Sequence, residues 1–487
     1  MSVAHTRAHA SGRTSSGAPS TTGVAAVCEG LAFWMLIAIV AWAPFPLGSN
    51  RQWSWSLLAA LVSINWSIWV LSVWGAPQKL RPLRRLFVPL VLSLLTLAWA
   101  LIQASTFVPS AWVHPVWQLG ADLLQRPVQG SISMDRWRTL TEVMKLATYL
   151  AAGVLAFMMA QRSERAQRMM DAIMLIGAFY AVYALGLSLA GLVQENIFYS
   201  TPPTGAGVAG PFVSHNNFAT YAGLAVLCAS VRLFDLGGST LIVGRGTRQF
   251  TVSAIYFFFG VGALPGACFL LSFAMLMATG SRAGSMACLV GILVLMAFGG
   301  VIAGHRLTRA WAAACVLAVG TVMVGLFLLT GDNLQTRIDA LVEAGSFDQT
   351  RLLLWQSALR MIGDAPLLGL GLGTFEPAYP MYADQALPFI MDRVHNDYLE
   401  FAAGLGIPAA IAWWAAIAWL TALSIRGVFV RRRNRQFSLL AVAATALVAF
   451  HSFFDFSLQI PAVALTYAVI LALGAAQSAP TRNVAFE

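Results

Sequence analysis

Residues 393–424 of this 487-residue chain read RVHNDYLEFAAGLGIPAAIAWWAAIAWLTALS. A dense polar cluster, Arg393 to Glu400, runs directly into an apolar segment. A transmembrane helix needs about 20 mostly apolar residues, and this segment is long enough. Charged and polar side chains at the mouth of a membrane segment usually serve binding or chemistry. The stretch therefore predicts a membrane protein with a functional site where a span meets water.

The composition extends this prediction to the whole chain. Hydrophobic residues make up 58% and charged residues only 10%, whereas a soluble domain carries about 25% charged residues. We therefore expect an all-α integral membrane protein with about twelve transmembrane helices. The candidate spans are 27–48, 54–75, 86–107, 140–160, 169–193, 217–235, 253–278, 284–303, 309–330, 397–424, 437–456 and 459–478.

The distribution of charge predicts how these spans are oriented. If the N-terminus is cytoplasmic, most of the 30 Lys and Arg residues fall in cytoplasmic segments, as the positive-inside rule requires. The net charge of +10 is thus a topology signal, and nucleic acid is not an expected partner. The expected domains are a disordered cytoplasmic tail (1–24), nine spans (25–330), an outer loop (331–396), three spans (397–478) and a cytoplasmic tail (479–487).

The long outer loop contains one regular pattern. Residues Thr350 to Gly363 predict an amphipathic helix with Asp348 as its N-cap. Its apolar face would consist of Leu352, Trp355, Leu359 and Ile362. Such a helix would lie on the membrane surface and cover a cavity below it. The glycine-rich run at 369–373 follows a helix and a proline, so we interpret it as a flexible turn and not as a nucleotide loop.

Arginines on the outer side are candidate anion ligands. Arg282 lies in a short turn between two apolar runs, where a guanidinium could bind phosphate oxygens in a bidentate manner. The alternative is an arginine that merely reaches the interface. Arg351 and Arg337 are candidates for a second anion ligand, and their alternative role is that of solvated loop charges.

His395 is the candidate for proton transfer. The ordinary pKa of histidine, near 6.5, suits a general base at neutral pH. Asp397 and Glu400 could orient it or bind a sugar, and Asn396 and Glu400 would share a helix face. The alternative is a polar cluster that only caps the helix. His215 with Asn216 offers a second polar turn, for which a capping role is equally open.

Metal ligation is not predicted. The seven histidines are scattered, and no HExxH or CxxC motif occurs. No cofactor is expected.

Four stretches together resemble one known family. They are Gly210 to Asn217, Thr279 to Gly284, Arg351 to Phe375, and His395 to Gly406. In this combination the chain resembles the O-antigen ligase and O-antigen polymerase superfamily of bacterial polytopic glycosyltransferases. The resemblance covers about residues 210–410.

The resemblance implies a GT-C-like fold of about twelve helices and transfer of a glycan from undecaprenyl diphosphate at the periplasmic face of the inner membrane. It implies Arg282 and Arg351, with Arg337 beside them, as diphosphate ligands and His395 as the base, with inversion at the anomeric carbon and no metal. The expected glycan or acceptor ligands are Asn396, Glu400, Tyr398, His215, Asn216 and Trp355. The implied partners are the lipid-linked donor, a glycan or lipid A-core acceptor, membrane lipids and a chain-length regulator.

The acceptor is predicted from two departures. Ala409 stands where ligases tend to carry Gly, Thr or Tyr, and the segment 451–461 looks more like that of polymerases of O-antigen or exopolysaccharide repeats. Polymerisation is therefore favoured over ligation to lipid A-core, and a protein O-oligosaccharyltransferase is a further alternative. A lipid-linked glycan transporter would place ionisable residues at the bilayer midplane, whereas Lys145, Asp171 and Asp455 lie near the ends of predicted spans.

Overall fold

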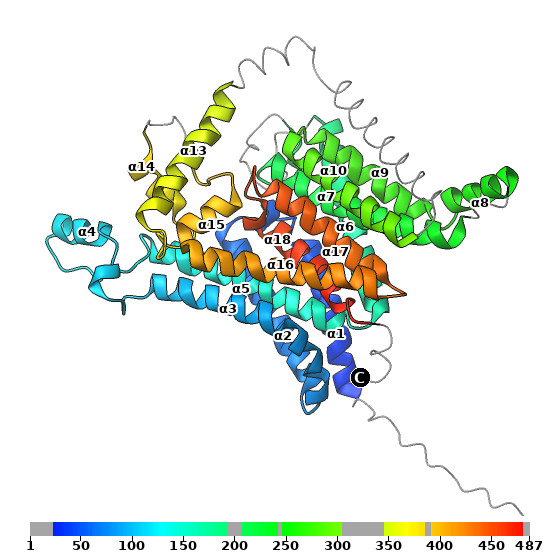
Figure 1. Cartoon of the computed structure of the whole chain (residues 1–487), viewed down its shortest axis with the longest axis horizontal. Helices are drawn as coiled ribbons and strands as arrows, with labels where there is room; N and C mark the ends of the chain where they lie inside the picture. Colours follow the sequence, from blue (N-terminus) through cyan, green and yellow to red (C-terminus); the bar gives the residue numbers. More distant parts are fainter. Residues whose placement is uncertain (1–22, 192–206, 242–245, 304–344, 385–390, 481–487) are drawn as a thin grey trace, which may run out of the picture.

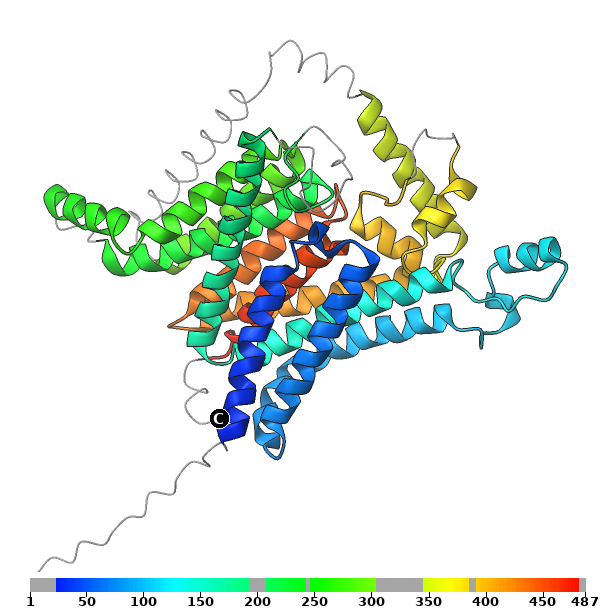
Figure 2. The same ribbon diagram turned by 180° about the vertical axis from the view of Figure 1, so that it is seen from behind.

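The computed structural model describes residues 23–191, 207–241, 246–303, 345–384 and 391–480, and every element in these ranges is helical (Figures 1 and 2). The helices of the first part are α1 (Gly23–Trp42), α2 (Gln52–Val73), α3 (Phe87–Ala104), α4 (Val116–Leu124), α5 (Arg136–Met159) and α6 (Ser163–Leu189). Those of the middle part are α7 (His215–Thr240), α8 (Thr247–Phe259), α9 (Ala263–Ala278), α10 (Arg282–Ala303), α13 (Gly345–Asp364) and α14 (Phe375–Tyr382). The last part contains α15 (Asp397–Leu405), α16 (Ile407–Val430), α17 (Arg435–His451) and α18 (Pro461–Ala476). Short 3₁₀ turns include η2 (Pro77–Leu86) and η4 (Ser457–Gln459).

Within the described residues, eight helices are long and apolar enough to cross a membrane. They are Gly23–Trp42, Gln52–Val73, Pro77–Ala104, Arg136–Met159, Ser163–Leu189, His215–Thr240, Arg282–Gly300 and Ile407–Val430. Helices α8 and α9 form a ninth candidate only if they count as one span, because they are bent by 67°. Helices α17 and α18 are apolar but shorter, and they coincide with the predicted spans 437–456 and 459–478. The predicted span 309–330 lies outside the described residues. The polytopic helical class is thus confirmed.

The predicted span 397–424 is wrong as a single helix. The chain breaks at Gly406, which has φ 80°, so α15 ends before α16 begins. A side chain at Gly406 would place its Cβ 2.4 Å from the carbonyl oxygen of Leu367, so both the backbone angle and the packing require glycine. The membrane-length helix therefore begins at Ile407, and the polar cluster lies on a separate short helix.

The amphipathic helix of the loop is present as α13, but its details differ from the prediction. The helix begins at Gly345, before Asp348, so Asp348 is not the N-cap. The face it buries carries Leu354, Ala358 and Met361, whereas the predicted Leu352 and Leu359 are more than half exposed. The helix packs on α15, and the side chains that face α15 are the ones that are buried.

The glycine-rich turn at 369–373 is buried and packed, which corrects its interpretation as flexible. Gly371 donates its N–H to Gly404 O at 2.9 Å, and Leu370 donates to Ala403 O at 3.0 Å. A Cβ at Gly369 would lie 2.3 Å from Gly404 O. The turn therefore lies directly against the C-terminal end of α15.

Polar contacts gather at two ends of the bundle. At one end, Glu29 of α1 accepts from Arg165 at 2.5 Å and from Lys79 at 3.4 Å. At the other end, the start of α5 meets the segment before α15, where Glu142 lies 3.6 Å from Arg393. Helices α13 and α14 lie beside α15 at this second end (Figure 1).

Candidate functional site

His395 occupies a strained turn immediately before α15. Its φ is 55°, a left-handed conformation that non-glycine residues rarely adopt and that needs support from neighbouring contacts. On one side, Glu400 Oε2 accepts the backbone N–H of Val394 at 2.9 Å. On the other, Asn396 caps α15 by accepting the N–H of Leu399 at 3.1 Å. The histidine is therefore held at both flanks.

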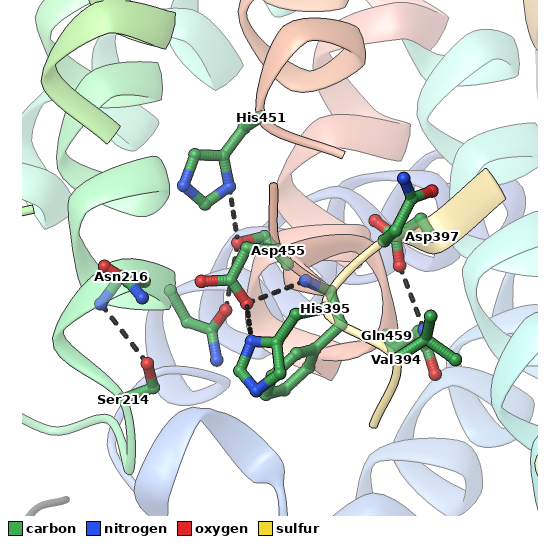
Figure 3. A network of polar contacts seen from close by, with 12 residues as sticks. Ser214, Asn216, Val394, His395, Asp397, His451, Asp455 and Gln459 are labelled. Carbon is green, nitrogen blue, oxygen red and sulfur yellow. Dashed lines mark hydrogen bonds and ion pairs between the residues drawn. The ribbon is translucent and has the colours of Figure 1, made fainter. Parts of the chain in front are cut away.

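Asp455 faces His395 from the turn that follows α17. Its Oδ1 lies 3.5 Å from His395 Nδ1 and accepts the N–H of Phe456 at 2.8 Å (Figure 3). Burial alone raises the pKa of Asp455, but the contact with His395 and its charge, helped by the charge of His451, bring that pKa down to about 2. The carboxylate is therefore ionised at neutral pH. It lies outside the spanning helices because α17 ends at His451, before the predicted end of that span at 456.

His451 is a second buried histidine beside Asp455. Its Nδ1 lies 3.0 Å from Thr220 Oγ1 and 3.1 Å from Ser457 Oγ. Within the described part of the chain, neither His451 Nε2 nor Asp455 Oδ2 has a hydrogen-bond partner, although both atoms are buried. Buried polar atoms without partners are uncommon and often mark a place for water or ligand.

The starts of α7 and α10 meet next to this pair. Ser281 Oγ donates to Asn216 Oδ1 at 2.7 Å, and Ser457 Oγ donates to Asn217 Oδ1 at 2.9 Å. Two of the predicted motifs, 210–217 and 279–284, are thus joined to each other and to the 451–459 turn. Arg282 is the first residue of α10, and its side chain is exposed at this end.

The predicted anion ligands come from separate segments. No carboxylate of the described ranges lies within ion-pairing distance of Arg282. Arg351 lies in the first half of α13, close enough to His451 for their charges to interact. Arg337 lies outside the described residues. Two of the three predicted arginines are therefore on elements that meet the site.

Residues 267–414 match a family model described as O-Antigen ligase. The chain carries an O-antigen ligase domain. This match supports the resemblance to the O-antigen ligase and polymerase superfamily that the sequence motifs indicated, and it indicates activity of the ligase or polymerase type on a lipid-linked glycan donor and an acceptor. No curated protein matches the chain.

The O-antigen ligase domain contains most of the predicted glycan ligands, but several of them already have structural partners. The Tyr398 hydroxyl donates to Ala449 O at 2.9 Å, and its ring lies between Trp414 and Phe453. Glu400 is 5% exposed, and both of its oxygens accept hydrogen bonds. Asn396 caps α15 and donates to Phe453 O at 3.2 Å. Their roles as glycan ligands stay predictions, and their contacts hold the turn at His395.

Two other predicted ligands, Trp355 and His215, lie on α13 and α7. Trp355 is half-buried on α13, and its indole N–H has no partner among the described residues. His215 begins α7 beside Gly207, where an added Cβ would lie 3.3 Å from His215 Cγ. Their roles as substrate ligands stay predictions.

Sequence reasoning noted Asp455, Lys145 and the 451–461 segment but gave none of them a role beside the histidine. Asp455 and His451 lie downstream of the O-antigen ligase match, while Glu142 and Lys145 lie upstream of it. Their polar side chains in or beside apolar runs were the available signal, but only the fold shows which of them meet. No group of three or more His, Cys, Asp or Glu in the described ranges could hold a metal ion.

Proposed function

We propose that this protein is an inverting, metal-independent glycosyltransferase that moves a glycan from undecaprenyl diphosphate to an acceptor hydroxyl. The observation that carries the proposal is the contact of His395 Nδ1 with the ionised carboxylate of Asp455, 3.5 Å away. Nδ1 is the ring nitrogen that faces the carboxylate, and the other nitrogen points away from Asp455 (Figure 3). That nitrogen is free to accept a proton.

The reaction follows from these groups. The acceptor oxygen attacks the anomeric carbon while His395 Nε2 takes the hydroxyl proton. The bond from that carbon to the diphosphate oxygen breaks, and undecaprenyl diphosphate leaves with the electron pair. Asp455 stabilises the imidazolium that forms, and Arg282 and Arg351 stabilise the leaving diphosphate, since guanidinium binds phosphate oxygens strongly. A single displacement inverts the anomeric carbon.

The proposal places the site at the periplasmic face of a bacterial inner membrane, with both termini in the cytoplasm. The family and the membrane-length helices support an inner-membrane protein. Lys79 and Arg165 gather with Glu29 at the end of the bundle away from His395, and basic residues favour the cytoplasmic side. This distribution supports the proposed orientation.

The acceptor we favour is a growing glycan of O-antigen or exopolysaccharide repeats. Ala409 and the 451–461 segment support a polymerase. The alternative is a ligase that transfers the glycan to lipid A-core, and the description of the matching family as O-Antigen ligase favours that alternative.

Gene deletion and inspection of surface glycans test the choice. Single repeats attached to lipid A-core, with no polymer, identify a polymerase. Loss of all attached glycan, with polymer left on the carrier lipid, identifies a ligase. Transfer by the purified protein from a synthetic lipid-linked donor tests the enzyme itself. If His395→Ala and Arg282→Ala both keep full transfer, the proposed site is wrong.

A further inference from the structure

Arg393 directly precedes the His395 turn, and its guanidinium is paired with two carboxylates of the protein. Its Nη1 lies 3.0 Å from Glu400 Oε1, its Nη2 lies 3.6 Å from Glu142 Oε1, and it also donates to Gln459. Burial alone lowers the pKa of Arg393, but the charges of Glu400 and Glu142 raise it above its usual value. Arg393 is therefore a permanently charged, internally paired arginine and not a third ligand for diphosphate.

Glu142 is fixed in place from several directions. Lys145 Nζ lies 2.7 Å from Glu142 Oε1 and 4.0 Å from the centre of the Trp55 ring. On another side, an added Cβ at Gly373 would lie 2.5 Å from Glu142 Cγ, so the side chain fills the space that this glycine leaves. Glu142 belongs to the transmembrane helix α5, which makes it an anchor for Arg393 on the membrane bundle.

Two routes connect this anchor with His395. One oxygen of Glu400 accepts a hydrogen bond from the Arg393 guanidinium. The other accepts the backbone N–H of Val394, the residue before His395. In addition, the guanidinium lies 5.9 Å from the centre of the Phe456 ring, and that ring packs edge-on against His395 with centroids 5.0 Å apart. Phe456 also donates its N–H to Asp455. Movement of Arg393 would therefore disturb both members of the His395–Asp455 pair.

We propose that Glu142, acting through Arg393, is a positioning residue for His395. The inference rests on the proposed function, in which His395 is the base. Glu142 lies outside the matched O-antigen ligase domain, residues 267–414. The first part of the chain thus contributes directly to the geometry of the site, and Arg393 of the domain is its point of attachment.

The test measures initial rates of the purified full-length protein with a synthetic lipid-linked donor and an acceptor glycan. We expect Glu142→Gln to lower kcat by about ten- to a hundredfold, because misplacement of a reacting group by about 1 Å has effects of this size. The KM for the donor should change little, because Arg282 and Arg351 are not touched. Glu142→Asp, which keeps the charge, should recover part of kcat.

A buried cation without its partner can prevent folding. A second variant, Glu142→Gln with Lys145→Met, removes one charge of each sign and leaves Arg393 with Glu400 alone. It should show the same loss of kcat. The matched control is Glu376→Gln, which breaks the 2.6 Å ion pair between α14 and Arg138, also on α5. Its kinetics should equal those of the wild type.

Combination with Asp455→Asn separates positioning from general support of the fold. If both residues act by orienting His395, the double variant should lose much less than the product of the two single losses. Multiplied losses, an unchanged kcat, or a change only in KM would each overturn the role of Glu142. Active wild-type protein with full activity in His395→Ala would instead overturn the proposed function, so the two failures are distinguishable.

Discussion

Asp455 Oδ1 lies 3.5 Å from His395 Nδ1, while Asp455 Oδ2 is buried with no hydrogen-bond partner among the described residues. The turn after α17 and the turn before α15 thus bring one carboxylate and one imidazole together. The pair is the part of the proposed mechanism that a single substitution can test most directly.

Asp455→Asn should lower kcat by about 10²–10⁴-fold, the usual contribution of a positioned acid–base group. The amide keeps the shape of the side chain but cannot stabilise the imidazolium. Initial rates of glycan transfer by purified protein measure the loss. Asp384→Asn, which breaks the exposed ion pair with Arg360 at 2.5 Å, is the control and should not affect the rate. Equal rates for both variants would remove Asp455 from the mechanism.

Arg282→Ala should lower kcat by about 10²–10³-fold, because one group that stabilises the leaving diphosphate is lost. Arg282→Lys should recover only part of this loss, since lysine keeps the charge but not the bidentate geometry. The rates are compared with Arg126→Ala, an exposed arginine beyond α4. Full activity of Arg282→Ala with the lipid diphosphate donor would contradict the assignment.

The pH dependence of stability should report on Asp397. Burial and the nearby charges of Glu400 and Asp455 raise its pKa to about 7, although hydrogen bonds from Gln459 and Ser452 oppose the shift. The unfolded value is about 3.9, so the folded state binds the proton more tightly. The stability from this group is fully present below about pH 4 and is lost as pH rises toward 7. The midpoint of thermal unfolding of the wild type, relative to that of Asp397→Asn, should therefore fall between about pH 4 and 7. A constant difference would contradict the raised pKa.

Gly369→Ala should destabilise the protein by about 1–3 kcal/mol, because it forces a side chain into packed backbone. Gly369 has φ 68°, and its Cβ would lie 2.3 Å from Gly404 O. Gly363→Ala is the control, because no atom lies within 4 Å of its Cβ. Midpoints of thermal unfolding in detergent measure the difference, and equal midpoints would show that the turn yields to the methyl group.

The helical membrane class and the grouping of distant motifs were predictable from sequence. Apolar runs mark spans whatever their neighbours are, and Ser281 and Asn216 belonged to motifs already singled out. The break at Gly406 was not predictable, because its cause is the carbonyl of Leu367, contributed by a distant turn. Asp348 failed as a cap for a related reason, since α13 starts earlier than its apolar pattern does.

The support around His395 was also beyond sequence patterns. The sequence places Arg393 in the polar cluster without a role of its own, and only the positions of Glu142 and Glu400 show what it contacts. Its neighbours therefore assign it a structural role. Tyr398 and Asn396 likewise donate hydrogen bonds to backbone carbonyls of distant residues, and no sequence motif specifies these acceptors.

Helix α3 carries two side chains that donate hydrogen bonds to backbone carbonyls just before the glycine-rich turn and at the end of α15. Gln103 Nε2 donates to Leu368 O at 2.6 Å and to Gly404 O at 2.8 Å, and Trp99 Nε1 donates to Leu405 O at 2.8 Å. About 300 residues separate the donors from Gly404 and Leu405. A growing chain makes α3 early and these carbonyls late. During synthesis, the donors on α3 have no acceptors until the later segment has been made. The site can therefore assemble only as one of the last steps of folding.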